Sequence, residues 1–216
     1  MANKLEVNPW RSIWIEPRST IREIVKFNPK HQFIWLSIIY GFPMILNFAQ
    51  SYSFSEMLPL WATVLAALIL SGFAGALGIV VISALLTWTG RWIGGKGTFQ
   101  TVRCAVAWSN TPNIVTILMW GVLIGVFGNQ LFYREFADSV FIGYESGIVF
   151  LVFLIESIVS IWGIVILLKG LSEVQGFSVW RAVVNVIIPI LLMVAFIWIM
   201  GWIFSGTHTN LITVVT

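Results

Sequence analysis

Five stretches of predominantly apolar residues are the strongest constraint on how this chain folds. A helix needs about 20 such residues to cross roughly 30 Å of hydrocarbon. The stretches cover residues 33–49, 58–88, 112–127, 147–168 and 182–204. Inside lipid a backbone must satisfy its own hydrogen bonds, and the alternating pattern of a transmembrane barrel is absent. We therefore predict an all-α polytopic transmembrane bundle with five spans.

The composition excludes the other broad classes of protein. Hydrophobic residues make up 58% of the chain and charged residues 10%, with a mean hydropathy of +0.92. A typical soluble domain has roughly 45–50% hydrophobic and about 25% charged residues. A disordered chain is poorer still in apolar residues. Cys104 is the single cysteine, which excludes an internal disulfide and a cysteine metal site. The small excess of twelve basic over nine acidic residues argues against nucleic-acid binding.

The basic residues are unevenly distributed among the segments that flank the five spans. Six precede the first span, three lie between the second and third, and two lie between the fourth and fifth. The remaining segments contain only Arg134. Because cytoplasmic loops carry an excess of Lys and Arg, we predict a cytoplasmic N-terminus. An odd number of spans then places the C-terminus outside the cell or in a lumen.

Residues 1–31 form a predicted cytoplasmic amphipathic segment, which is too charged to be a cleavable signal peptide. Within it, residues 17–27 show a helical spacing of apolar and basic residues after Pro17, and Trp10 and Trp14 precede this stretch. A basic amphipathic helix with tryptophans favours the headgroup plane of the membrane. The alternative is a helix packed on the cytoplasmic loops. A five-helix membrane domain over 32–205 and a short outer tail over 206–216 complete the expected organisation.

One short pattern occurs twice, each time after a predicted cytoplasmic loop and ahead of a span. It runs from Gly97-Thr98-Phe99 through Arg103 and Ala105 to Pro112, and again from Gly176-Phe177 through Arg181 and Ala182 to Pro189. Glycine permits the turn into the next helix, phenylalanine anchors at the headgroups, and arginine reaches phosphates. The pattern is consistent with a parallel duplication of two spans, or with shared topology alone.

The same segments carry a resemblance to a known family. They are Gly94-Gly95-Lys96-Gly97-Thr98-Phe99, Ala107-Trp108-Ser109-Asn110-Thr111-Pro112, Leu168-Lys169-Gly170-Leu171 and Gln175-Gly176-Phe177-Ser178-Val179-Trp180-Arg181-Ala182. In order and placement they resemble the Yip-domain family, which is named for proteins that interact with Ypt/Rab GTPases at the Golgi. The resemblance covers roughly residues 10 to 205. It implies a five-helix membrane domain with a cytoplasmic N-terminus.

The resemblance implies less about activity. Eukaryotic members have a longer cytoplasmic front end with an Asp-Leu-Tyr-Gly-Pro motif, which this sequence lacks. GTPase binding is therefore not supported. The opening Trp10 and Pro17-Arg18-Ser19-Thr20 resemble prokaryotic members, which implies a multi-pass protein of the bacterial cytoplasmic membrane.

Glu156 is the most costly residue to place in a membrane, because it lies near the middle of the fourth span. A carboxyl group at that depth is protonated or paired. It is a candidate for a proton or ion relay, or for a structural hydrogen bond between helices. Asn110 and Asn113 lie at a suitable depth to be its partners, and Asn185 is a candidate to join them. These four residues form the predicted intramembrane polar cluster.

Two further sets of residues are candidates for contacts. Arg103, Arg181, Lys96 and Arg22 are expected to contact lipid phosphates or an acidic partner, although anchoring at the membrane surface alone also accounts for them. Small residues favour close helix packing, within one bundle or between two copies of the chain. The candidates are Gly72, Gly75, Gly78, Gly121 and Gly125.

No sequence motif of a known class of enzyme occurs in this chain. His31 and His208 fall on opposite sides of the predicted membrane, so they cannot share a metal. We expect no cofactor and no catalytic role. The sequence favours a membrane scaffold that contacts lipids, other membrane proteins or a second copy of itself through a basic cytoplasmic face. The alternative is a small transporter or channel component that uses the polar cluster around Glu156.

Overall fold

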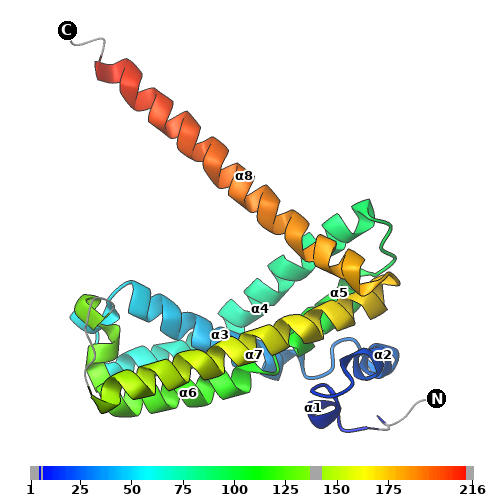
Figure 1. Cartoon of the computed structure of the whole chain (residues 1–216), viewed down its shortest axis with the longest axis horizontal. Coiled ribbons are helices and arrows are strands. Elements are labelled where there is room, and N and C mark those ends of the chain that lie inside the picture. The colour runs from blue at the N-terminus through cyan, green and yellow to red at the C-terminus, as the bar shows by residue number, and fades with distance from the viewer. Residues whose placement is uncertain (1–4, 6, 137–142, 213–216) are drawn as a thin grey trace.

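The computed structural model describes residues 5, 7–136 and 143–212, and every regular element in them is helical. The α-helices are α1 (Pro9–Ser12), α2 (Pro17–Phe27), α3 (Phe33–Ser51), α4 (Leu60–Trp92), α5 (Phe99–Ser109), α6 (Asn113–Phe127), α7 (Tyr144–Gln175) and α8 (Val179–Ile212). Short 3-10 turns η1 (Phe54–Glu56), η2 (Gly128–Phe132) and η3 (Arg134–Phe136) lie between them. The predicted all-α class is confirmed (Figure 1).

Within the residues that the structure describes, five segments are long and apolar enough to cross a membrane, as the sequence predicts. They are Phe33–Ser51, Leu60–Trp92, Phe99–Phe132, Tyr144–Gln175 and Val179–Ile203. The spans predicted at 58–88 and 147–168 fall within longer helices. Helix α8 continues to Ile212, inside the predicted tail, and the last tail residues, 213–216, lie outside the described part of the chain.

Pro43 does not break the first span. Helix α3 continues through it, and the Asn47 side-chain amide donates a hydrogen bond of 2.9 Å to the Pro43 carbonyl oxygen. In the same way, α8 continues through Pro189. Neighbouring side chains and packing allow proline inside membrane helices, where the freed backbone groups would otherwise be unsatisfied.

Helices α3 and α4 approach so closely that their backbones touch. Ser37 and Gly41 of α3 face Ser71 and Gly75 of α4, and all four are buried. A Cβ atom on Gly41 would overlap the Ser71 carbonyl group, and one on Gly75 would overlap the Ser37 carbonyl group. Small residues four apart on each helix therefore make this contact, as in other close helix pairs in membranes.

The other candidate glycines fall into two groups. Gly72 lies beside Ile38 of α3, and Gly78 lies against the ring of Tyr40, so both belong to the same helix pair. Gly121 and Gly125 of α6 are exposed, and a Cβ atom added to either would meet no heavy atom within 4 Å. The α4 glycines thus pack within the bundle, whereas the α6 pair lies on its surface.

Helix α5 is enclosed by protein rather than left for lipid. Seven of its eleven residues are buried, including Trp108, and α2, α3, α4 and α7 all contact it. The following helix α6 buries only Trp120 and Phe127. The third span is therefore built from an inner half that is wrapped by other helices and an outer half that is largely exposed, with a turn at 110–112 between them.

The N-terminal amphipathic helix packs on the bundle. Ile21 and Ile24 of α2 are fully buried among residues of α5 and α7. Of the two placements that the sequence left open, the structure has the helix packed on the protein, so its apolar side is not free to enter lipid.

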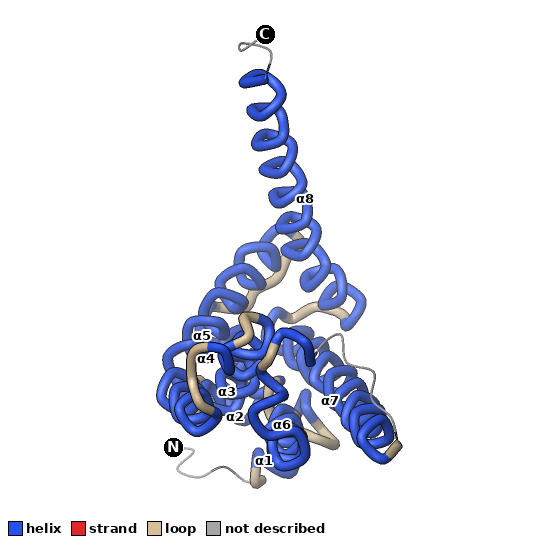
Figure 2. The backbone as a smooth tube through the Cα atoms, turned by 90° about the vertical axis from the view of Figure 1, so that its left-hand side faces the viewer, coloured by secondary structure: helices blue, strands red, loops and turns tan. Residues whose placement is uncertain are grey.

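Among the side chains of α8 that the structure describes, the buried ones lie near its beginning. Ala182 and Asn185 are buried against the bundle, whereas nearly all side chains from Ile187 to Ile203 are exposed. Figures 1 and 2 show the helix diverging from the other spans as it leaves this anchored first part.

Gly75→Ala tests the α3–α4 contact. The added methyl group must push the α3 backbone away, so we expect a loss of about 1–3 kcal/mol of stability, the usual cost of overpacking. Gly121→Ala is the matched control, because its methyl group meets no neighbour. Thermal unfolding in detergent should show a lower melting temperature for Gly75→Ala alone, and equal melting temperatures would contradict the contact.

Candidate functional site at the basic end

At one end of the molecule α4 and α7 finish and α5 and α8 begin (Figure 1), and we call it the basic end because of the basic residues in these segments. The backbone N–H of Lys96, in the loop before α5, donates a hydrogen bond of 2.9 Å to the Gln175 carbonyl oxygen at the end of α7. The exposed cations there are Arg18, Arg22, Lys26, Lys30, Arg91, Lys96, Lys169 and Arg181. Glu16 is exposed nearby, whereas Glu23 and Glu173 are partly buried.

Ion pairs attach α2 to the last turns of α7. Arg22 Nε and Nη2 lie 2.5 and 2.9 Å from the two carboxylate oxygens of Glu173. Arg18 Nη2 donates a 2.8 Å hydrogen bond to Ser172 Oγ, and Arg18 Nε lies 3.5 Å from Glu173. The hydrogen bond and the charge of Glu173 raise the pKa of Arg22 above its usual value. Two-point pairing of this kind fixes orientation as well as distance.

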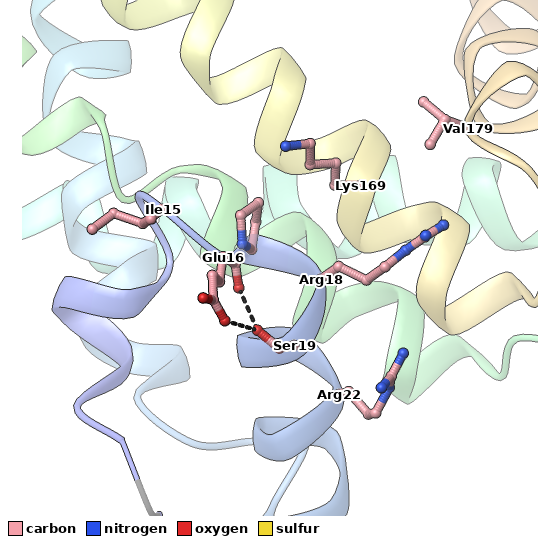
Figure 3. Close-up of a pocket in the computed structure, with 8 residues that line it drawn as sticks. Ile15, Glu16, Arg18, Ser19, Arg22, Lys169 and Val179 are labelled. Atoms are coloured by element: carbon pink, nitrogen blue, oxygen red, sulfur yellow. Dashed lines mark hydrogen bonds between the residues drawn. The ribbon is translucent and has the colours of Figure 1, made fainter.

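A cavity of about 460 Å³ opens between α2, α7 and the start of α8, and we call it the α2–α7 pocket (Figure 3). Its lining residues are Ile15, Glu16, Pro17, Arg18, Ser19, Arg22, Lys169 and Val179. Two cations come from α2 and one from α7, while the Ser19 hydroxyl donates a 3.0 Å hydrogen bond to the Glu16 carboxylate. The sequence interpretation included Arg22 but missed Arg18 and Lys169 as partners of one pocket.

Gln175 joins three segments at the basic end and was missed from sequence. It is fully buried, its Oε1 accepts a 3.1 Å hydrogen bond from Gly97 N–H, and its Nε2 donates a 3.3 Å bond to the Leu86 carbonyl. Cβ atoms on Gly90, Gly95 or Gly97 would collide with its side-chain amide. The glycines around Lys96 therefore make room for this amide, and their repeated occurrence was the available signal.

Asn185 lies beside Gln175 rather than beside Asn110. The Thr89 hydroxyl of α4 donates a 2.8 Å hydrogen bond to Asn185 Oδ1, and both residues are buried. Within the part of the chain that the structure describes, Asn185 Nδ2 has no hydrogen-bond partner. Asn185 thus anchors the beginning of α8 to the end of α4.

The remaining members of the predicted intramembrane cluster lie in the turn after α5, at the start of α6 and on α7. Asn110 Nδ2 donates a 2.7 Å hydrogen bond to the Val106 carbonyl, and Asn113 Nδ2 lies 3.5 Å from Asn110 Oδ1. Glu156 is half-buried on α7. Among residues 5, 7–136 and 143–212, its carboxylate makes no hydrogen bond or ion pair. The structure therefore brings the two asparagines of the turn together without linking them to Glu156 or Asn185.

Arg103 differs from the other candidate cations because aromatic rings enclose it. Its guanidinium carbon lies 4.7 Å from the Phe33 ring centroid and 5.7 Å from that of Phe99. Its Nε is buried and has no hydrogen-bond partner in the described residues. Lys96 and Arg181 are exposed. Arg103 therefore ties α5 to α3, while Lys96 and Arg181 are free to meet a ligand at the surface.

The two copies of the repeated Gly-Phe pattern have different local geometry. Gly97 packs under the Gln175 amide, whereas Gly176 ends α7 with a left-handed φ of 70°. Each precedes the start of a helix, α5 at Phe99 and α8 at Val179. The glycine is thus required by close approach in one copy and by backbone conformation in the other.

These features define a multi-pass α-helical membrane protein whose spans are joined by small residues and buried amides. A comparison with protein-family models matches the Yip1 domain to residues 11–201. The chain therefore belongs to the Yip1 domain family, and the resemblance seen in its sequence motifs is confirmed. Neither the search of curated proteins nor that of solved structures gives a match.

Gln175→Ala tests the role of the buried amide. It leaves the Gly97 N–H unpaired and opens a void, so we expect a loss of about 1–3 kcal/mol of stability. Gln100→Ala is the matched control, because Gln100 is exposed on α5. Unfolding in detergent should separate the two variants. Equal stability would mean that the amide does not hold the basic end together.

Proposed function

We propose that this chain is a non-enzymatic membrane organiser, which holds acidic partner proteins or anionic lipids at its basic end. The observation that carries the proposal is the charge pattern: eight exposed cations from separate segments share this end with one exposed acid, Glu16. The partly buried Glu173 is already occupied by Arg18 and Arg22. A surface of this kind attracts anionic lipid or an acidic protein.

The orientation follows from the same charges. Cytoplasmic segments carry the excess of Lys and Arg, so the basic end faces the cytoplasm and α8 ends on the other side. The resemblance of Trp10 and Pro17-Arg18-Ser19-Thr20 to prokaryotic members supports a bacterial cytoplasmic membrane as its location. GTPase recognition does not belong to the proposal, because the motif of the eukaryotic front end is absent.

Affinity purification in mild detergent tests the proposal with Lys96→Ala combined with Arg181→Ala. Both side chains are exposed, so the fold should persist. A basic residue near an anionic surface contributes about 1 kcal/mol, so losing two predicts a roughly 30-fold weaker retention of acidic partners or anionic lipid. The bound protein and lipid are identified and quantified by mass spectrometry.

Arg134→Ala is the control for that experiment, because Arg134 is an exposed cation in the connection between α6 and α7, away from the basic end. Retention should be unchanged in this variant. If the wild type enriches no acidic protein or anionic lipid over an unrelated five-span membrane protein, the proposed function is wrong.

A transport role is the second candidate, favoured by the half-buried Glu156 without a partner in the described residues. Glu156 lies twelve residues after the first residue of α7, about 18 Å along the helix axis at 1.5 Å per residue. A carboxyl group at this depth marks many ion and proton paths.

Glu156→Gln separates the two candidates. Translocation predicts that this substitution abolishes proton-coupled flux in reconstituted vesicles while the melting temperature stays unchanged. A purely structural carboxyl predicts unaltered behaviour for Glu156→Gln and a loosened bundle for Glu156→Leu. Absence of flux in the wild type would exclude transport and leave the organiser proposal standing.

A further inference from the structure

The α2–α7 pocket concentrates positive charge from two different helices. Arg18 and Arg22 extend from α2 toward the same side, and Lys169 lines the cavity from α7, with its ammonium group pointing away from the two guanidinium groups in this view (Figure 3). The volume of about 460 Å³ falls within the range of small-molecule sites, roughly 300–1,000 Å³. A cavity with three cations at one end of a membrane bundle fits an anionic headgroup.

The acids around the pocket leave part of this charge uncompensated. Glu173 takes both close hydrogen bonds of Arg22 and only a 3.5 Å contact from Arg18. Glu16 accepts a hydrogen bond from Ser19. In the part of the chain that the structure describes, Lys169 forms no ion pair. Lys169 is therefore the pocket cation without an ion pair, and Arg18, which also donates to Ser172 Oγ, has a weaker contact with Glu173 than Arg22 has.

The start of α2 adds donors to the same cavity. Pro17 occupies the first helical position, and no side chain caps the helix at Glu16. The first backbone N–H groups of a helix have no partner within it and favour an anion. Helix α2 has eleven residues, and its first backbone N–H groups add to the attraction of the pocket cations for an anion.

Apolar side chains at the mouth distinguish a lipid from a soluble anion. Ile15 and Val179 line the cavity, and their side chains are 80% and 39% exposed. Trp180, the next residue, is 81% exposed at the start of a membrane span, the position where tryptophan meets the headgroup region. A ligand with a phosphate and acyl chains matches both parts of this surface.

We infer that the α2–α7 pocket binds the phosphate of an anionic phospholipid, with Arg18 and Lys169 as its principal contacts. The inference rests on the proposed function, since it assigns one site and one ligand class to the basic end. Bound lipid bridges α2 and α7 beside the start of α8. It adds to the Glu173 ion pairs that already join α2 to α7.

The test compares two pairs of substitutions that remove the same charges. Arg18→Gln with Lys169→Gln removes the pocket cations, and Arg91→Gln with Lys30→Gln removes an arginine and a lysine elsewhere on the basic end. Each protein is titrated in detergent with phosphatidylglycerol, and retained lipid is measured by native mass spectrometry. Phosphatidylcholine is the neutral reference lipid.

The pocket pair should lose about tenfold more affinity for phosphatidylglycerol than the control pair, whose smaller loss measures the general contribution of charge at the basic end. Arg18→Lys with Lys169→Arg preserves the charges and should retain binding, which shows that a loss does not reflect misfolding. Equal losses in the two neutralised pairs would overturn the inference in favour of diffuse attraction. Loss in the charge-preserving pair would overturn it as well.

Glycerol phosphate identifies the source of the phosphate. It should displace phosphatidylglycerol only weakly, because it lacks acyl chains, and displacement as effective as that by the lipid would overturn the lipid assignment. Failure of this inference can be distinguished from failure of the proposed function. If phosphatidylglycerol binds no better than phosphatidylcholine, but Lys96 and Arg181 still retain acidic proteins, this inference fails alone.

Discussion

Contacts between small residues and a few buried hydrogen bonds hold this bundle together. In lipid, burying apolar side chains between helices gives little driving force, because the hydrocarbon around them is equally apolar. The α3 and α4 helices are instead held by close packing at Gly41 and Gly75, where their backbones touch. At the basic end, Gln175 joins the α4 terminus, the loop before α5 and the end of α7.

The hydropathy pattern was sufficient to predict the helical class and the five spans, because span length is set by bilayer thickness. It was not sufficient to place α5. The segment of α5 is moderately polar, and the hydropathy pattern therefore begins the third span only after it, at residue 112. In the structure α2, α3, α4 and α7 surround this helix. Burial by protein depends on which helices are neighbours, and a single sequence does not contain that information.

Some cations of the candidate site could be recognised from the sequence, but the way in which the site is assembled could not. Lys96, Arg181 and Arg22 were recognised from their position in basic segments. The pairing of Arg18 with Glu173 spans most of the chain, and hydropathy carries no signal for it. Asn185 was recognised as polar and intramembrane, but its partner is Thr89, which lies on a different helix from the expected Asn110. Pairwise chemistry is readable from sequence only where the partners are near in the chain.

The buried side chains described on α8 lie in its first turns, which form the pivot about which this helix can tilt like a lever. Its membrane segment, Val179–Ile203, contains 25 residues, so it is about 37 Å long at 1.5 Å per residue. The part from Asn185 to Ile203 is about 27 Å long at 1.5 Å per residue, so a tilt of about 10° at Asn185 would displace Ile203 by about 5 Å. Small adjustments of packing at the fulcrum are thereby amplified on the opposite side of the bilayer.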